Sequence, residues 1–529
     1  MTHLPFRSTP SRAQKSFYDP DVLLEQRPLK ADSFYVRFRT ICDEVLPDAL
    51  FADLYTGIGR PPISPSLLMR LHLLMSHARC GDEMAIENLL YDERWRYMCH
   101  LPLPDCTLHP TTLHYFRLRL LFGTINRTEI ARLQAEGIQL RDAPIQRIFE
   151  ETKRVAVELG LLDPAKAQYV DSTYILGAAA VQDTFALLFQ GIRQAIQAHG
   201  LTVDAATQQA VVAALRRTEY TTDRKKPEID WHDAAARSAL LADLVHDAAT
   251  LLTVCDGVDS AAVRTALAQM TRLVAQDVEV SEDGKTTIRQ GVAPDRQCSV
   301  VDPEMRHGRK SSSKRFTGYK AHVAVEPTSG LLTAIVTTAG SLHDGLATAA
   351  ILEQTRPAVL GGDNAYAGAD VRAAALAQGT AILTPTADAT PYQKDQFALD
   401  VDAGTVTCPA GQTANIGKQG SVHFSAKTCS ACPFHGLCNP SGKGRTFTLG
   451  AHETLQRHLR ATARSGTWAE FLRLRCVVEH TLAKFLRWAG RQGRYVGTTK
   501  TGLQMAFGAI GYNLDQLGRH RVLRTNQAT

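Results

Sequence analysis

No segment of the sequence is both long and apolar, and this absence is the first limit on what the protein can be. A helix needs about 20 consecutive apolar residues to cross a bilayer, and no run here approaches that length. With 44% hydrophobic and 21% charged residues, the composition is typical of a globular protein. The opening "MTHLPFRSTPSRAQKS" also lacks the apolar core of a secretion signal. We therefore expect a cytoplasmic protein of bacterial type with no membrane partner.

The cysteine content does not fit a disulfide framework. The chain has 11 cysteines, an odd number in a long sequence without a signal, which favours reduced thiols or metal ligands. Its length of 529 residues exceeds what one hydrophobic core usually serves. About two to four domains are therefore expected.

Acidic residues are scarce in two segments. Residues 471–529 contain ten Lys or Arg against two acids, and residues 305–320 contain six Lys or Arg and no acid. The net charge of the whole chain is only +6, so the rest of it is acidic overall. Basic charge confined in this way is typical of a surface that binds a polyanion. Ordinary solvated side chains are the alternative.

Changes of pattern along the chain divide it into segments. Stretches such as "SPSLLMRLHLLMSHARCG", with a Ser cap and Pro at the first helical position, predict helices. Alternating β-branched residues and helical stretches predict an α/β core, interrupted twice. The expected segments are a flexible arm (1–28), an N-terminal helical DNA-binding or dimerisation domain (29–125), the α/β core (126–177, 314–390 and 466–515), a helical insertion with a basic loop (178–313), a β-rich cysteine-bearing insertion (391–465) and a basic tail (516–529).

Three acids stand in distinctive settings. Asp171 lies inside the predicted strand "AQYVDSTYILGA", Asp363 follows the apolar run "VLGG", and Glu479 lies on an amphipathic helix expected to run unbroken through "TWAEFLRLRCVVEHTLAKFLRW". An Asp in a first strand, a hairpin, an Asp after a fourth strand and a Glu on a late helix describe a ribonuclease-H-like core with a mixed five-stranded sheet. Each acid has a simpler explanation: a helix cap for Asp363, a local hydrogen bond for Asp171, and an ion pair with Arg475 for Glu479.

Converging carboxylates have a specific chemistry. They repel one another unless a cation lies among them. Mg²⁺ prefers oxygen ligands and is commonly shared between carboxylates and substrate phosphates. Two such ions about 4 Å apart can hold the attacking and leaving oxygens of a phosphoryl transfer.

The same stretches resemble a known family. "YVDSTYI", "GYKAHVAV" followed by a hairpin and "HDG", "VLGGDNAY" and "RCVVEHTLAKF" closely resemble the DDE transposases of bacterial insertion sequences. The N-terminal "GRPPISPSLLMRLHLL" and "TLHYFRLRL" resemble the helical domain that precedes the catalytic core in these enzymes. Cysteine-bearing insertions before the catalytic Glu also occur in similar proteins.

This resemblance implies an activity. The expected function is metal-dependent cleavage of double-stranded DNA at the ends of an insertion sequence and strand transfer into target DNA, by an active homodimer. Asp171, Asp363 and Glu479 would be the catalytic residues and the ligands of two Mg²⁺ or Mn²⁺ ions. A nuclease on the same core, or a non-catalytic DNA-binding protein derived from a transposase, are the alternatives.

Two positions depart from the family signature around the Glu. Leu472 stands where many relatives have Tyr, and Leu486 stands where they have Lys. Lys484 or Arg487 is expected to contact a phosphate instead. Likewise Asn364 follows the second Asp, where relatives often have Lys.

Further basic residues are expected to contact DNA. Arg475 is placed to bind a phosphate one turn before Glu479. Lys320 either faces the site or lies on the surface of its strand, while Asp344 is expected to cap the following helix. The basic loop that precedes the hairpin is expected to follow the DNA backbone and contains Arg306, Arg309, Lys310, Lys314 and Arg315.

A group of four cysteines predicts a structural Zn²⁺ site. Cys408, Cys429, Cys432 and Cys438 fall within 31 residues and include a Cys-x-x-Cys pair. Zn²⁺ takes four thiolate or imidazole ligands, so His435 could replace one of them. Unligated thiols or a redox pair are the alternative.

Overall fold

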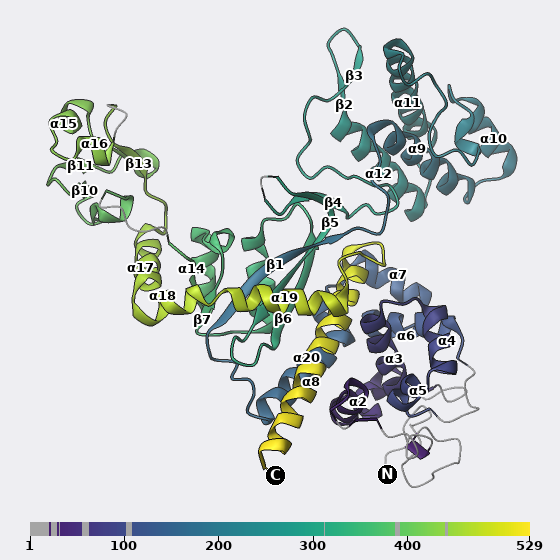
Figure 1. Ribbon diagram of the computed structural model, residues 1–529. Helices are drawn as coiled ribbons and strands as arrows, with labels where there is room; N and C mark the ends of the chain where they lie inside the picture. Colours follow the sequence, from purple (N-terminus) through teal and green to yellow (C-terminus); the bar gives the residue numbers. More distant parts are fainter. Residues whose placement is uncertain are drawn as a thin grey trace.

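The computed structural model describes residues 21–22, 29–30, 32–55, 63–101, 108–311, 313–386, 392–439 and 443–528. All but two residues of the predicted arm, 1–28, therefore lie outside the described residues. The chain has a mixed α/β fold, in which helices surround a central mixed sheet (Figure 1). Among the described residues, no helix is long and apolar enough to cross a membrane.

The central sheet positions the acids. Its strands are β1 (Gln168–Leu176), β4 (Arg306–Arg309), β5 (Arg315–Val325), β6 (Leu332–Ala339), β7 (Val359–Gly361) and β8 (Ala381–Leu383). β5 is antiparallel to β1, β4 and β6, whereas β7 and β8 run parallel to β1. β5 pairs with both β4 and β6, and from β5 the order along the sheet continues with β1, β7 and β8. This arrangement is consistent with a ribonuclease-H-like core.

The sheet has one strand more than the five predicted. Part of the segment expected to be a basic loop forms β4, which pairs with the start of β5 from Arg306↔Gly318 to Arg309↔Arg315. β4 reads Arg-His-Gly-Arg, which has little intrinsic preference for a strand, so the pairing with β5 decides its structure. The basic residues consequently lie on a hairpin.

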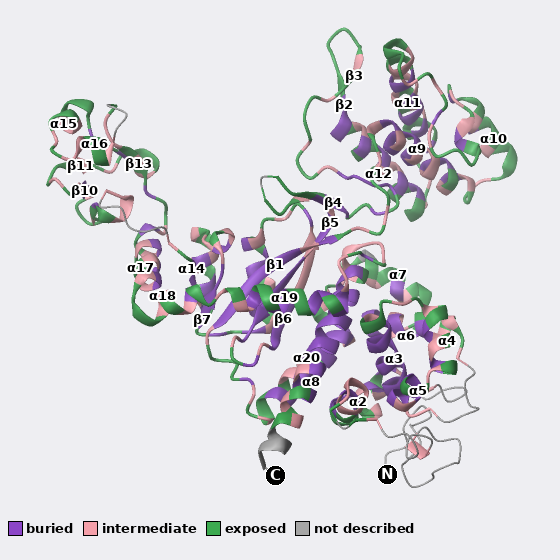
Figure 2. Ribbon diagram, viewed as in Figure 1, coloured by how far each residue is buried: buried purple, intermediate pink, exposed green. Residues whose placement is uncertain are grey.

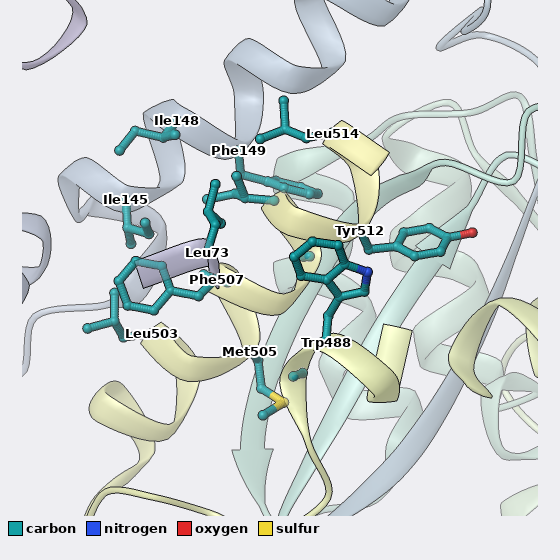
Figure 3. Close-up of a cluster of buried hydrophobic side chains, with 14 of the residues drawn as sticks. Leu73, Ile145, Ile148, Phe149, Trp488, Leu503, Met505, Phe507, Tyr512 and Leu514 are labelled. Carbon is teal, nitrogen blue, oxygen red and sulfur yellow. The ribbon is translucent and has the colours of Figure 1, made fainter. Parts of the chain in front are cut away.

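Helices N-terminal to β1 form one continuous core with the C-terminal part of the chain. Figure 3 shows side chains of this core, among them Leu73, Phe149 and Leu514. The 31-residue helix α20 (Thr498–Ala528) packs along the sheet strand β6 and along the helices around it, and most of its length is buried (Figure 2). The N-terminal helices are α2 (Phe34–Val45), α3 (Pro65–Ala78), α4 (Asp82–Tyr91), α5 (Glu93–Cys99), α6 (Pro110–Phe122), α7 (Arg127–Ala135) and α8 (Pro144–Glu158).

Two segments have small cores of their own. Between β1 and β4 lie α9 (Thr184–Gly200), α10 (Ala205–Ala213), α11 (Ala234–Val254), α12 (Ala261–Asp277) and the short hairpin of β2 (Val278–Val280) and β3 (Thr286–Ile288). After β7 and β8, with α13 (Thr348–Gln354) and α14 (Ala369–Ala377), comes a module of three-residue strands and two very short helices. Figure 1 shows this module at the far left, connected to the sheet through α17 (Glu453–Arg464).

The helix expected to carry Glu479 is in fact two helices. α18 (Gly466–Arg473) ends two residues before α19 (Cys476–Ala489) begins. α18 buries Leu472 in a small core with β7 and α17, whereas α19 buries Val478 and Phe485 in the main core. Because the two apolar faces serve different cores, the chain bends at Leu474, whose side chain is 53% exposed. The prediction of one unbroken helix through this segment is therefore wrong.

Trp488 joins α19 to the N-terminal helices. Its ring lies 5.4 Å from the Phe38 ring and 4.8 Å from the His77 ring, measured between centroids. On its other side it meets α20 at Gly511, where a Cβ atom would come within 2.4 Å of the indole. The glycine thus lets the two helices approach closely.

We predict that Trp488→Ala lowers the free energy of unfolding by about 3–5 kcal/mol, because it leaves a cavity between three helices. Thermal and denaturant unfolding of the full chain would measure this. Arg487→Ala, an exposed neighbour on the same helix, should change stability by less than about 0.5 kcal/mol. Equal effects of the two substitutions would contradict the proposed packing role.

Candidate active site

The pairing of β1 with β7 brings two of the three acids together. The two strands are parallel, with Gln168 beside Leu360 and Tyr169 beside Gly361. Continuing this register by two residues places Asp363 next to Asp171. Parallel neighbours lie about 4.8 Å apart and their side chains share a face of the sheet. The Asp363 carboxylate is indeed close enough to contribute to the raised pKa of Asp171.

Asp363 lies just beyond the end of its strand, at the edge of a cavity. It accepts a hydrogen bond from the backbone N–H of Ala365 at 2.9 Å and so caps the short turn that follows. The cavity has a volume of about 240 Å³. Before Asp363, a Cβ atom at Gly361 would come within 2.6 Å of the Phe471 ring, and one at Gly362 within 3.0 Å of Tyr366 and Val170, so little room exists there for a side chain.

Arg475 connects the third acid to the first. Its guanidinium lies 3.0 Å from the Glu479 carboxylate and 3.6 Å from the Asp171 carboxylate. α19 packs on β1, and Figure 1 shows it crossing in front of the sheet. Burial of Val478 and Phe485 on one side of α19 leaves Glu479 exposed on the other. The Glu479 carboxylate therefore reaches the other acids through Arg475.

Asp171 is a buried carboxyl group between positive charges. Burial, the largest effect, raises its pKa, whereas Lys310, the N–H of Ser172 and Arg475 lower it. The Lys310 ammonium lies 4.0 Å from this carboxylate and donates a hydrogen bond to the Ser172 carbonyl. Asp171 also accepts a hydrogen bond from the N–H of Ser172 at 2.7 Å. The simpler explanation of each acid is therefore also present: a cap at Asp363, a local bond at Asp171, and an ion pair at Glu479.

A fourth carboxylate, Asp344, belongs to the same cavity. The prediction that Asp344 caps its helix is wrong, because the cap is His343, whose Nδ1 accepts from the N–H of Gly345. The Asp344 carboxylate accepts instead from the Ser172 hydroxyl at 2.5 Å and from the Lys320 ammonium at 2.6 Å. The motif "HDG" was the only signal in the sequence that pointed to it.

Two residues predicted to contact DNA, Arg306 and Lys320, make contacts within the protein. The Arg306 guanidinium is buried, pairs with Asp295 at 2.7 Å and donates to backbone carbonyls. Lys320 is tied to Asp344 and to the carbonyl of Leu342. The prediction for Arg306 is wrong, because its side chain is buried and paired within the protein. Lys320 lines the cavity that also contains Asp344 and Asp363, so it faces the site, and its contact with DNA stays a prediction. The remaining predicted contacts reach solvent: Arg309, Lys310, Lys314, Arg315, Arg475, Lys484 and Arg487.

Arg491 is a basic residue of the site that the motifs did not indicate. It follows α19, and its guanidinium donates to the Thr173 hydroxyl at 3.0 Å and lies 4.2 Å from the Tyr174 ring centroid. Lys314, from the β4–β5 hairpin, lies over the same ring at 5.0 Å. These contacts extend the basic surface alongside β1.

The chemistry of the carboxylates fits a divalent ion such as Mg²⁺, since hard cations prefer oxygen ligands. Within the residues that the structure describes, no three His, Cys, Asp or Glu side chains are grouped closely enough to hold an ion. Arg475 and Lys310 lie beside the Asp171 carboxylate, at 3.6 Å and 4.0 Å. The carboxylate oxygens are therefore ligands of the type that Mg²⁺ prefers, and basic side chains lie beside them.

A larger cavity, of about 630 Å³, lies elsewhere, between residues 134–141, 303–304 and 496–502. Its two carboxylates are already engaged: Glu304 accepts from the N–H of Thr498, and Glu353 pairs with Arg141. Size alone therefore does not identify the site.

The predicted zinc ligands Cys408, Cys429, Cys432 and Cys438 lie together in the distant module (Figure 1).

His322 lies behind the carboxylates. It is buried on β5, with its Nδ1 atom 3.4 Å from the Tyr366 hydroxyl and its Nε2 atom 2.9 Å from the Thr338 hydroxyl. Burial is the main cause that lowers the pKa of His322 to about 4, and Lys320 and Lys310 add to it, while Asp344 opposes it. The imidazole is therefore neutral at physiological pH.

Two family models match the chain. The model described as "Transposase DDE domain" matches residues 275–514, which include Asp363 and Glu479. The model described as "Transposase domain (DUF772)" matches residues 22–119. Asp171 lies outside both matched segments. Neither a curated protein nor a solved structure was found to match the chain.

We predict that His322 makes the protein less stable in acid. Its pKa is depressed in the fold, so the unfolded state takes up the proton first, and stability falls as the pH drops from the ordinary value of 6.5 towards about 4. His322→Gln cannot be protonated and should lose less stability over this window. Melting temperatures of both proteins across the window would test this; parallel curves would contradict it.

Proposed function

Because the chain belongs to the DDE transposases of the insertion-sequence type, with an N-terminal domain before the catalytic one, we propose that it cuts double-stranded DNA at the ends of its element and joins the freed 3′ ends to target DNA. Asp171, Asp363 and Glu479 are the proposed catalytic residues. The observation that carries this assignment is the β1–β7 register, which pairs Tyr169 with Gly361 and, continued by two residues, brings Asp171 beside Asp363.

The proposed metal site consists of these three carboxylates. Bound Mg²⁺ or Mn²⁺, as a pair of ions, would stabilise the negative charge that develops on the attacking and leaving oxygens. The chain itself supplies the carboxylates: one within a buried strand, one at the end of the neighbouring strand, and one on α19, which packs on β1 and β5.

DNA is proposed to lie along the basic hairpin and α19. Arg309, Lys310, Lys314 and Arg315 surround the turn between β4 and β5, and Lys310 reaches from this turn to the edge of Asp171. Lys484 and Arg487 are exposed on α19. Such contacts position the DNA backbone without reading its sequence.

Arg475 is proposed to change partners when DNA binds. Its guanidinium now neutralises Asp171 and Glu479. A phosphate is a better bidentate partner for a guanidinium, so binding of DNA would draw Arg475 away and free both carboxylates for the metal. Lys310 would exchange the Ser172 carbonyl for a phosphate in the same way.

Two element ends must be brought together for transposition, which supports a homodimer as the active complex. This step of the proposal rests on the chemistry of joining two ends. It is independent of the roles given to the carboxylates.

We predict that Asp363→Asn abolishes cleavage and joining, because it removes a charge from the metal site while keeping the shape of the side chain. DNA binding should remain. The test incubates the full chain with Mg²⁺ and DNA carrying the element ends, and resolves the products on a denaturing gel. The control is Asp370→Asn, since the Asp370 side chain is 96% exposed on α14.

The pattern of products separates the alternatives. Cut and joined strands from the wild type alone support the proposal. Cut strands without joined products would indicate a nuclease, and binding without cutting would indicate a regulatory DNA-binding protein. Cleavage by Asp363→Asn would contradict the assignment of the catalytic residues.

We predict two opposite effects for Arg475→Ala. Cleavage should slow by about 10- to 100-fold, because a charge-assisted contact with a phosphate is lost. Mn²⁺ should bind the DNA-free chain more tightly, because a positive charge has left the carboxylates. Mn²⁺ titration followed by electron paramagnetic resonance would measure the second effect, with Arg473→Ala, exposed on α18, as the control. Weaker Mn²⁺ binding by Arg475→Ala would contradict the exchange.

A further inference from the structure

The cysteine-bearing module has very little apolar core. It consists of the strands β9 (Ala398–Asp400), β10 (Thr405–Thr407), β11 (Thr413–Asn415), β12 (Ser421–His423) and β13 (Thr446–Thr448) and the helices α15 (Ala426–Ser430) and α16 (His435–Cys438). Five buried side chains form its core: Phe397, Val406, Val422, Phe424 and Leu449. A module of this size usually needs disulfides or a metal to stay folded.

Four cysteines surround a small cavity beside this core. Cys408, Cys429, Cys432 and Cys438 all line a space of about 30 Å³. That volume is the share of about one water molecule, so it is too small for an organic ligand and suits a single ion. None of the four cysteines forms a disulfide. Cys408 lies on a different strand–turn unit from the other three cysteines, so the fold is needed to bring all four to one cavity.

The backbone that follows Cys408 turns back and directs an N–H group at the cysteine sulfur. The N–H of Gln412 donates to the Cys408 sulfur at 3.3 Å, and the N–H of Gly411 donates to the Cys408 carbonyl at 2.8 Å. Gly411 has a φ of +79°, which a residue with a side chain rarely adopts.

One ring nitrogen of His435 also faces this cavity's surroundings. The Nε2 atom is shielded from solvent and has no hydrogen-bond partner among the described residues, and His435 lines the same cavity. An unpaired buried nitrogen is costly, and an ion or an ion-bound group in the cavity would remove this cost.

We propose that Cys408, Cys429, Cys432 and Cys438 bind one structural Zn²⁺ ion, which holds the cysteine-bearing module together. Zn²⁺ takes four thiolates tetrahedrally at about 2.3 Å, and four thiol protons leave on binding. In the described parts of the chain the sulfurs are not yet close enough to hold an ion. Binding therefore contracts the cavity by drawing α15 and α16 towards Cys408.

α17 attaches the module to the catalytic domain, so the order of the module also affects the catalytic domain. Asp395 pairs with Arg460 at 2.6 Å, and the Arg457 guanidinium donates to the Lys394 carbonyl at 3.0 Å. α17 in turn packs on α18, the helix that leads into Glu479. A metal ion that orders the module therefore also stabilises α17 and α18, the helices that precede α19.

The test is the metal content of the full chain, purified without chelator and measured without DNA. We expect about one Zn²⁺ per chain, loss of this zinc in Cys429→Ser/Cys432→Ser, and its retention in Cys476→Ser, which removes an exposed cysteine outside the module. Co²⁺ exchanged into the wild type should give the visible absorption of a tetrahedral thiolate site. The spectrum should be the same in His435→Ala; a changed spectrum would overturn the four-cysteine ligand set in favour of His435.

The wild-type protein alone can overturn the proposal, even if the double variant fails to fold. Zinc-free native protein whose four thiols react freely with a thiol reagent would overturn it. So would a mass lower by two hydrogens per cysteine pair, which indicates a disulfide. Because no DNA is involved, this result is separate from the outcome of the cleavage experiment.

Discussion

Two carboxylates on neighbouring strands repel each other unless positive charge lies between them, and the centre of this structure depends on that constraint. The parallel pairing of β1 with β7, continued by two residues, brings Asp171 next to Asp363. Burial makes the charge on Asp171 still more costly. In the chain alone Lys310 and Arg475 supply the compensating charge; during the reaction a divalent ion is proposed to supply it.

The rest of the fold can be understood as support for this arrangement. β1 is central in the sheet, so Asp171 cannot move far. Glu479 is held less tightly, because only one side of α19 is buried and its N-terminal end follows a bend in the chain. The rigid pair and the more adjustable third acid suit a site that must exchange basic side chains for metal and DNA. Trp488, at the other end of α19, anchors the helix to the N-terminal domain.

Much of the core could be predicted from sequence because its signals are local. β-branched runs and a Pro/Gly turn predicted β1 and the β5–β6 hairpin, and an apolar run followed by two glycines predicted the strand before Asp363. The family resemblance is confirmed by the two matching models. The assignment of the three acids remains a proposal, although the register of β1 and β7 supports it.

The features that could not be predicted depend on contacts between distant residues. β4 is a strand only because β5 pairs with it. The bend at Leu474 arises because the two halves of the expected helix pack into different cores. The sequence predicted a DNA contact for Arg306, but in the structure Arg306 pairs with Asp295. It predicted a helix cap for Asp344, but the fold brings Ser172 and Lys320 to this carboxylate.

The central claim, that Asp363 is a metal ligand, is tested most directly by replacing its oxygen donors with sulfur. The measurement is cleavage of element-end DNA by Asp363→Cys in Mg²⁺ and in Mn²⁺. Mg²⁺ binds thiolates poorly, whereas Mn²⁺ tolerates a softer ligand. The account predicts no cleavage in Mg²⁺ and partial recovery in Mn²⁺. Cleavage by Asp363→Cys in Mg²⁺ at the wild-type rate would contradict it.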